Sequence, residues 1–165
     1  MIEKLAACCA DLGADAYLVG GFVRDWLLFA KPGHDIDIAV SGDPEVVAQA
    51  IAQRLSGTVV PLGLTHGVIR VAGSGNSESG DPPWNVDING FNGLIEEDLG
   101  RRDFSVNAMA VPIADWPSTD AVIDHLGGKV DLATKTIRAL NPLVFQDDPG
   151  RLLRAIRLAG QFKRS

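Results

Sequence analysis

The stretch from residue 16 to residue 40 constrains the fold most, because it changes its hydrophobic spacing twice. Residues 16–20 and 36–40 are short apolar runs of the length and composition of β-strands. Between them, Gly20-Gly21 predicts a turn, and Val23, Trp26 and Leu27 then recur at helical spacing. A strand, a helix and a second strand in this order indicate a sheet that carries helices.

The rest of the chain continues this mixture of short strands and helices. Asp43 is a candidate N-cap before Pro44, and Leu152, Leu153, Ile156 and Ala159 share one face of a C-terminal helix. The predicted fold class is α+β (α/β mixed), with one sheet flanked by helices and covered on one side. Further strands are predicted at 58–62, 67–72, 84–88, 121–124 and 136–140. Helices are predicted at 2–12, 44–55, 94–100, 128–134 and from 149 onward, with 104–111 passing from helix into strand and 73–83 as a loop.

Composition indicates one ordinary domain, or one domain and the start of another, in 165 residues. No apolar run is long enough to span a membrane, and the N-terminus lacks the features of a secretory signal. The adjacent Cys8 and Cys9 have no metal-binding spacing, so we expect reduced thiols in a cytoplasmic protein. The net charge of −6 argues against a nucleic-acid coat protein. From Arg151 onward there are five bases and no acid, so we expect an RNA-binding part beyond this point.

Two acidic strands are the first candidate catalytic feature. Asp35 and Asp37 are two residues apart in a predicted strand, so both side chains should face the same side. Neighbouring carboxylates repel unless a cation lies between them, and oxygen ligands suit Mg²⁺ that carries nucleotide phosphates. Asp87, inside the apolar run 84–88, is a candidate third acid. The alternative is that these acids lie on the solvated face of an edge strand.

The second candidate feature is a set of groups suited to anions. Gly20-Gly21 at a helix start allows backbone N–H groups to approach a phosphate, and Arg24 lies one turn further on. Arg102 could add a planar fork for a triphosphate. Asp148 and Arg151 together could read the edge of a base. Each segment taken alone is equally compatible with a tight turn, a charged surface helix or a capped helix with a basic stripe. In the last segment Arg154 and Arg157 follow Arg151 at intervals of three residues.

These segments, in this order, resemble the class II family of tRNA nucleotidyltransferases (CCA-adding enzymes) and bacterial poly(A) polymerases. LVGGFVRDWLL with DID is similar to the first motif of that family, and RRDFSVNAMA to the second. Asp124, Gly128 and Arg138 fit its head-to-neck motif. DDPGRLLRAIRLA is similar to its nucleotide-selecting helix. The resemblance runs from about Tyr17 to the end of the chain, with a gap near the middle.

The resemblance implies a polymerase-β-like nucleotidyltransferase head over residues 1–140 and the start of a helical neck over 141–165. It implies an enzyme that adds C or A from CTP or ATP to an RNA 3′ end, most simply CCA to tRNA, with release of pyrophosphate. The roles that it implies are Mg²⁺ binding by Asp35 and Asp37, with Asp87 as a possible third catalytic acid, and nucleotide binding by Gly20, Gly21, Arg24, Arg102, Asp148, Arg151, Arg154 and Arg157.

Three departures from the family pattern bear on these expectations. Asp147 stands where the family usually has Glu. The segment between Asp87 and Arg101 is short and lacks a T-F-R motif that helps the family to switch between nucleotides. The chain ends inside the first expected neck helix, so we expect weak RNA binding.

Several functions remain open at this point. A poly(A) polymerase, a CC-adding or an A-adding enzyme would share these motifs, and a non-catalytic nucleotide-binding module would share the glycine turn and the arginines. The intact Asp35–Asp37 pair argues against the last of these. A Rossmann-type dinucleotide site is excluded, because Gly20-Gly21 lacks the G-x-G-x-x-G spacing.

Overall fold

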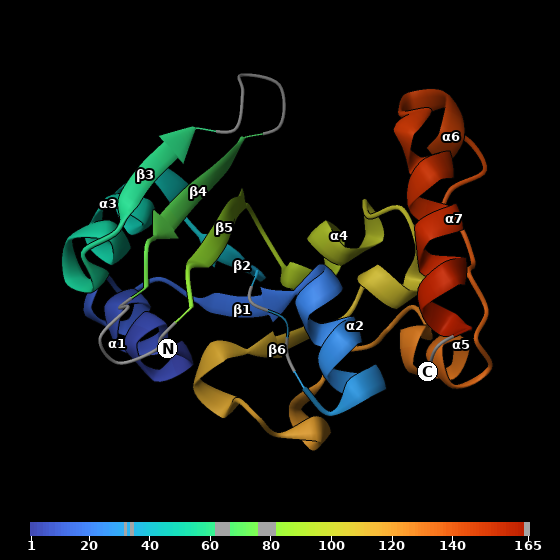
Figure 1. Cartoon of the computed structure of the whole chain (residues 1–165), viewed down its shortest axis with the longest axis horizontal. Coiled ribbons are helices and arrows are strands. Elements are labelled where there is room, and N and C mark those ends of the chain that lie inside the picture. The colour runs from blue at the N-terminus through green and yellow to red at the C-terminus, as the bar shows by residue number, and fades with distance from the viewer. Residues whose placement is uncertain (32, 34, 62–66, 76–81, 164–165) are drawn as a thin grey trace.

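One six-stranded sheet forms the centre of the molecule in the computed structural model (Figure 1), which describes residues 1–31, 33, 35–61, 67–75 and 82–163. The strand order is β3-β4-β5-β2-β1-β6. β2 and β5 are parallel, and the other neighbours are antiparallel. The strands are β1 (Ala16–Val19), β2 (Asp35–Ser41), β3 (Thr58–Pro61), β4 (Val68–Gly73), β5 (Trp84–Phe91) and β6 (Ala110–Pro112).

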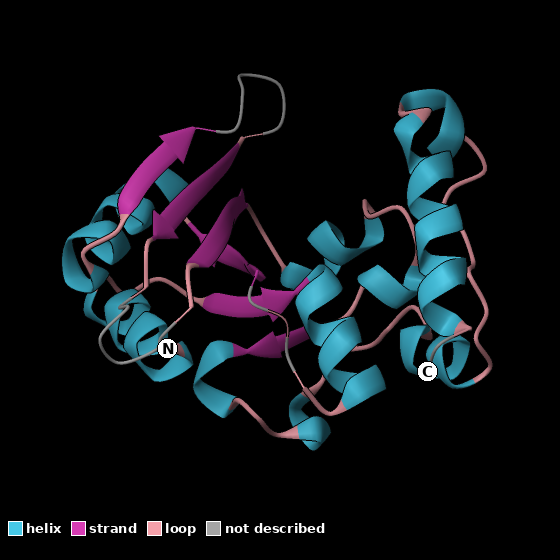
Figure 2. Cartoon of the chain, viewed as in Figure 1, coloured by secondary structure: helices cyan, strands magenta, loops and turns pink. Residues whose placement is uncertain are grey.

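Helices lie around this sheet, and the C-terminal helices extend the molecule beyond one end of it (Figure 2). β3 and β4 lie at one end of the molecule in Figure 1, and the last two helices lie at the other. Among the described residues, no helix has the length and apolarity needed to cross a lipid bilayer. The helices are α1 (Ile2–Asp11), α2 (Gly20–Phe29), α3 (Pro44–Leu55), α4 (Ile95–Gly100), α5 (Gly128–Ala133), α6 (Val144–Asp147) and α7 (Gly150–Phe162).

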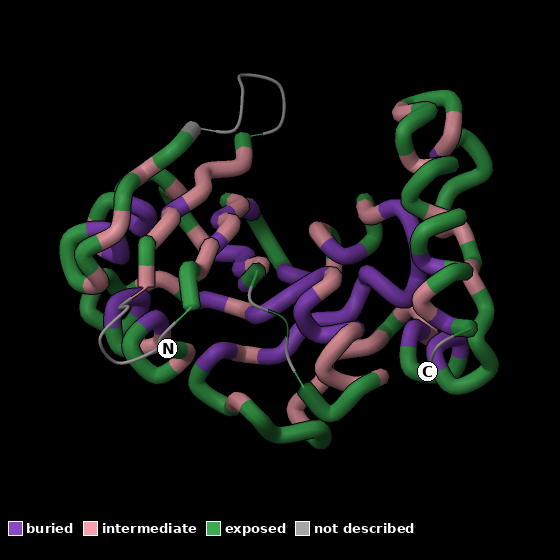
Figure 3. Tube along the Cα trace, in the orientation of Figure 1, coloured by how far each residue is buried: buried purple, intermediate pink, exposed green. Residues whose placement is uncertain are grey.

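The core is unequal on the two faces of the sheet. The larger cluster joins one sheet face, including Leu18 and Ile38, to α1, α2 and α3. A smaller cluster packs Val19 and Ala39, from the other face, against α4. The prediction of an α+β fold with one well-covered sheet face is therefore confirmed, and α4 adds a small second cover. Figure 3 shows the buried segments in the central strands, whereas most of α7 is exposed.

Helix α3 begins as its local sequence signals predicted. The Asp43 side chain accepts a hydrogen bond from the Glu45 backbone N–H at 2.8 Å, and Pro44 occupies the first turn of α3.

Cys8 and Cys9 are free thiols buried on α1. Burial, followed by the neighbouring Cys8, raises the pKa of Cys9 to about 11, so this thiol is unreactive near neutral pH.

The predicted strands at 121–124 and 136–140 were wrong. Each forms only an isolated bridge, between Ala110 and Ile123 and between Phe104 and Ala139. A 3₁₀ turn occupies 119–121, so no ladder can extend there. The short helix α6 was not predicted. Residue 62 of the predicted strand 58–62 and residues 76–81 of the predicted loop 73–83 lie outside the described residues.

The prediction of a single apolar face on α7 was wrong, because some of its apolar residues are buried and others are exposed. Leu158 and Phe162 are buried in the main core cluster. Leu152, Leu153 and Ile156, predicted to form one apolar face, are each more than half exposed.

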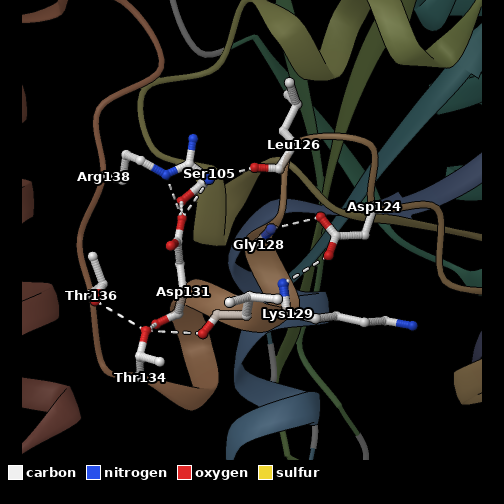
Figure 4. A network of polar contacts seen from close by, with 10 residues as sticks. Ser105, Asp124, Leu126, Gly128, Lys129, Asp131, Thr134, Thr136 and Arg138 are labelled. Atoms are coloured by element: carbon white, nitrogen blue, oxygen red, sulfur yellow. Dashed lines mark hydrogen bonds and ion pairs between the residues drawn. The ribbon is translucent and has the colours of Figure 1, made fainter.

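The segments around α5 form no extended strand pairing, and polar side-chain contacts hold them together (Figure 4). The Asp124 carboxylate accepts from the N–H groups of Gly128 and Lys129 at 2.6 and 2.8 Å, which caps α5. Arg138 pairs with Asp131 at 2.7 Å and donates to the Leu126 carbonyl at 2.5 Å. The three residues assigned to the head-to-neck motif, Asp124, Gly128 and Arg138, therefore meet around one short helix.

Gly128→Ala is expected to destabilise the protein by about 2 kcal/mol or more, as an overpacked site does. A Cβ at this position would lie 2.5 Å from the Ser105 carbonyl oxygen and 2.8 Å from Cγ of Met109. Chemical denaturation would measure the loss. Gly160→Ala on α7 is the matched control, because a Cβ there meets nothing within 4 Å. An equal effect of the two substitutions would contradict the close packing.

Candidate active site

The glycine pair at the start of α2 lies directly against the predicted acidic strand. Gly20 has φ +66°, and a Cβ on it would lie 3.0 Å from Nη1 of Arg102 and 3.3 Å from Oδ2 of Asp37. A Cβ on Gly21 would lie 3.4 Å from Nη2 of Arg24. A side chain at either position would fill the space between the helix N-terminus and these charged groups. The glycines therefore leave that space open for an anion.

The three predicted acids lie on one sheet face, on interior strands. Ile36 and Ile38 are buried, so Asp35 and Asp37 project from the opposite face of β2. Asp87 on β5 is the register partner of Asp37. Because β2 and β5 both have strands on each side, the alternative of an edge strand was wrong for these acids.

The surroundings of Asp37 disfavour its ionised form. Burial, and then the charge of Asp87, raise the pKa of Asp37 from 3.8 to about 6, although Arg102 and Arg24 act in the opposite direction. Among the described residues, none donates a hydrogen bond to Asp37. A carboxylate in this position is stabilised by a proton or by a cation.

Asp35 and Asp37 are the residues of this site that could hold a divalent metal. Among the described residues, no three Asp, Glu, His or Cys side chains form a full ligand group. Asp35 contributes to the raised pKa of Asp37, so the two charges lie within interaction range. Two carboxylates with open positions suit Mg²⁺, which usually binds one or two protein carboxylates together with substrate phosphates.

Two arginines are held rigidly beside the glycines. Arg24 is 5% exposed; its Nε donates to Asp25 at 2.8 Å, and its Nη1 donates to the Asn107 side-chain carbonyl. Arg102 pairs with Asp98, one turn earlier on α4, at 2.9 Å. These contacts hold the side-chain nitrogens of both arginines close to Gly20 and Gly21.

Helix α7 brings the remaining predicted arginines to the same place. Arg154 donates to the buried Asp103 at 2.6 Å, and Asp103 also accepts from Asn107 at 3.0 Å. A continuous polar path therefore joins α7 to Arg24. Arg151 lies 3.8 Å from Asp148, whose other oxygen accepts from the Gly150 N–H at 2.9 Å.

These groups line one open cavity of about 460 Å³. Five arginines and three aspartates face it, so its charge is positive although the whole chain carries −6. Asp35 and Asp148 do not line it. The lining consists of Gly20, Gly21, Arg24, Asp37, Asp87, Asn89, Arg102, Asp103, Asn107, Arg151, Arg154 and Arg157.

Comparison with known families places most of the lining of this cavity, but not its α7 arginines, in a recognised domain. The family model of the poly A polymerase head domain matches residues 16–138. The chain belongs to this family. The matched residues contain the six strands of the sheet, the glycine pair and the three acids. Helix α7 lies beyond the last matched residue.

Relatives of this head domain are enzymes that act on tRNA. The chain is 42% identical to a CC-adding tRNA nucleotidyltransferase of Geobacter sulfurreducens over 94% of its own length, and 36% identical to an A-adding tRNA nucleotidyltransferase of Aquifex aeolicus over 88%. It spans 34% and 18% of those two proteins.

Solved structures give the same relationship. A CCA-adding enzyme in complex with ATP superposes with a TM-score of 0.77 at 34% identity, over 98% of this chain and 37% of that one. The Thermotoga maritima CCA-adding enzyme complexed with tRNA gives 0.75 at 34% identity, over 95% and 36%.

Four lining or adjoining residues of the head domain were not predicted from sequence. Asn107 and Asp103 lie inside RRDFSVNAMA, so the motif itself was the signal for them. Asn89 follows Asp87 at the spacing of two that marks one strand face. Arg70 had a weaker signal, as one charged residue in the apolar run 67–72.

Proposed function

We propose that this chain is the catalytic head of a template-independent nucleotidyltransferase that adds C and A to the 3′ end of tRNA, using CTP and ATP and releasing pyrophosphate. The observation that carries the proposal is Asp37, beside the glycine start of α2 and inside a cavity lined by arginines. The relatives named for CC, A and CCA addition support this substrate class. Within the proposal, residues 1–140 form the head and residues 141–165 begin the neck.

Asp35 and Asp37 would hold Mg²⁺ in this enzyme. When bound, the metal lowers the pKa of an attacking hydroxyl and neutralises charge on the triphosphate. This chemistry needs no residue of the chain to act as a covalent nucleophile. The first turn of α2, with Arg24 and Arg102, would bind and orient the triphosphate, leaving its α-phosphate open to the RNA hydroxyl.

The other side of the cavity would hold the sugar and base. In the proposal, Arg151 in the lining and Asp148, which lies 3.8 Å from it outside the lining, read the base edge by donating and accepting hydrogen bonds. Arg154 and Arg157 assist at the nucleotide. The Asp103 contact fixes Arg154, so α7 is held in register with the phosphate-binding turn. Base reading without a nucleic-acid template requires such fixed geometry.

The test is incorporation into a tRNA transcript that lacks its 3′ CCA, with Mg²⁺ and each nucleotide triphosphate separately and together. Three defined nucleotides support CCA addition, and two cytidines or one adenosine indicate a partial enzyme. A long A tail would favour a poly(A) polymerase, the alternative that the family description suggests. ATP binding without any incorporation would instead indicate a non-catalytic module.

Arg151→Ala is expected to reduce discrimination between CTP and ATP by about tenfold, the value of one charge-assisted hydrogen bond. The thermal midpoint should change little, because among the described residues Arg151 contacts only the Val144 carbonyl and the Asp148 carboxylate. Asp148→Ala should act in the same direction. Single-nucleotide incorporation rates would measure the ratio. An unchanged ratio in both variants would contradict the base-reading role.

A further inference from the structure

Arg70 contacts an acid of the site from β4, a strand that carries none of the motifs identified in the sequence. Its Nε donates to Oδ1 of Asp87 at 2.6 Å, and its Nη2 donates to Oδ2 at 2.7 Å. The Arg70 and Asp87 side chains are 33% and 17% exposed. Two parallel hydrogen bonds of this kind fix the orientation of a carboxylate as well as offset its charge.

The sheet register explains why such a contact is needed. Asp37, Asp87 and Arg70 are direct cross-strand neighbours on β2, β5 and β4, so their side chains share one face. Like charges directly opposite one another destabilise a sheet, and a cation at the next position offsets one of them. The row therefore reads acid, acid, base across three interior strands.

The three acids also differ in their protein donors. Asp35 accepts a hydrogen bond from the Asn85 side chain at 2.9 Å, and both oxygens of Asp87 accept from Arg70. Asp37 has no donor among the described residues. A bound cation is therefore expected to compensate Asp37 first, whereas Asp87 is already compensated.

We propose that Arg70 is a positioning residue that holds Asp87 as an ion-paired neighbour of Asp37 and keeps Asp87 out of the metal ligand set. The inference rests on the proposed function and narrows it, because Asp35 and Asp37 alone then hold the cation. Without Arg70, the Asp87 carboxylate is free to turn toward Arg24 or Arg102. It also adds an uncompensated negative charge to a cavity that must accept a triphosphate.

The experiment measures Mn²⁺ binding by electron paramagnetic resonance and binding of a non-hydrolysable ATP analogue by calorimetry. Arg70→Met should weaken binding of the ATP analogue by about tenfold, the value of a lost charge-assisted contact. It should tighten Mn²⁺ binding, because the released Asp87 carboxylate adds a negative charge and an oxygen ligand beside Asp37. Asp87→Asn, and Arg70→Met combined with Asp87→Asn, should each remain within about threefold of the parent, because neither leaves an unpaired acid. Asp37→Asn should lose Mn²⁺ binding.

Arg54→Met is the matched control, since it breaks the exposed Arg54–Asp11 pair away from the cavity and should change neither affinity. Arg70→Lys keeps the charge without the fork and should fall between the parent and Arg70→Met; it replaces Arg70→Met if that variant does not fold. Asp87→Asn as damaging as Asp37→Asn, or no rescue in the double variant, would overturn the inference and leave the proposed function standing. A parent chain that binds neither probe would overturn both.

Discussion

Asp37→Asn is expected to abolish nucleotide transfer and to stabilise the fold at neutral pH. The substitution removes one of two proposed metal-binding carboxylates. A bound metal supplies several kcal/mol of charge stabilisation in such reactions, so the rate should fall by about 1,000-fold or more. The gain in stability follows from the environment of the side chain, which lies partly buried beside Asp87 with no donor among the described residues.

The sign of the stability change follows from the raised pKa of Asp37. The folded protein binds this proton more tightly than the unfolded chain, whose pKa is near the ordinary 3.8. The favourable contribution of the protonated form is fully present below about pH 4 and is lost as the pH rises through about 6. The difference corresponds to up to about 3 kcal/mol at pH 7.5. Asn carries no charge, so it avoids this loss.

Urea unfolding of the parent and of Asp37→Asn at pH 4.5 and 7.5, without divalent metal, would measure the gain in stability and its dependence on pH. The two proteins should differ more at pH 7.5 than at pH 4.5, and Mg²⁺ should raise the stability of the parent alone. Asp120→Asn, at an exposed acid, is the control and should show no such pH dependence. Equal stability of the parent and Asp37→Asn at both pH values would contradict the unfavourable environment of Asp37.

The local part of the site could be predicted from sequence because strand geometry determines it. Alternation with Ile36 and Ile38 fixes Asp35 and Asp37 on one face, whatever the strand pairs with. The glycine pair follows the same logic, since a strand that turns directly into a helix needs residues without side chains at a close approach. Those residues do lie beside Asp37.

The partners of the site residues could not be predicted in this way. Arg24 and Asn107 are 83 residues apart, and Asp103 and Arg154 are 51 apart, so tertiary packing alone brings them together. The Arg70–Asp87 pair depends on the register between β4 and β5, which short patterns do not encode. The failed strand at 136–140 has the same origin, because among the described residues it forms a single bridge, between Ala139 and Phe104, and Phe104 belongs to no strand.

Asp103→Ala is expected to lower the free energy of unfolding by about 3 kcal/mol, because it leaves buried donors without an acceptor. Asp103 is 4% exposed and accepts from three groups: the Phe104 N–H at 2.8 Å, Asn107 at 3.0 Å and Arg154 at 2.6 Å. Asp103→Asn keeps the shape and one acceptor oxygen, so it should lose less.

The same substitution should weaken nucleotide binding, because Asp103 joins α7 to the phosphate-binding turn. Without Asp103, the Asn107 side chain is no longer held in place, so Arg24 loses the fixed acceptor of its Nη1 group. Arg154 also loses its carboxylate partner and becomes free to leave the cavity. Denaturation and calorimetry with an ATP analogue would measure the two effects. Asp98→Ala, which breaks the Arg102 pair within one helical turn, should cost only about 0.5 kcal/mol of stability. If Asp103→Ala loses stability but binds nucleotide as the parent does, Asp103 supports the fold without coupling α7 to the turn.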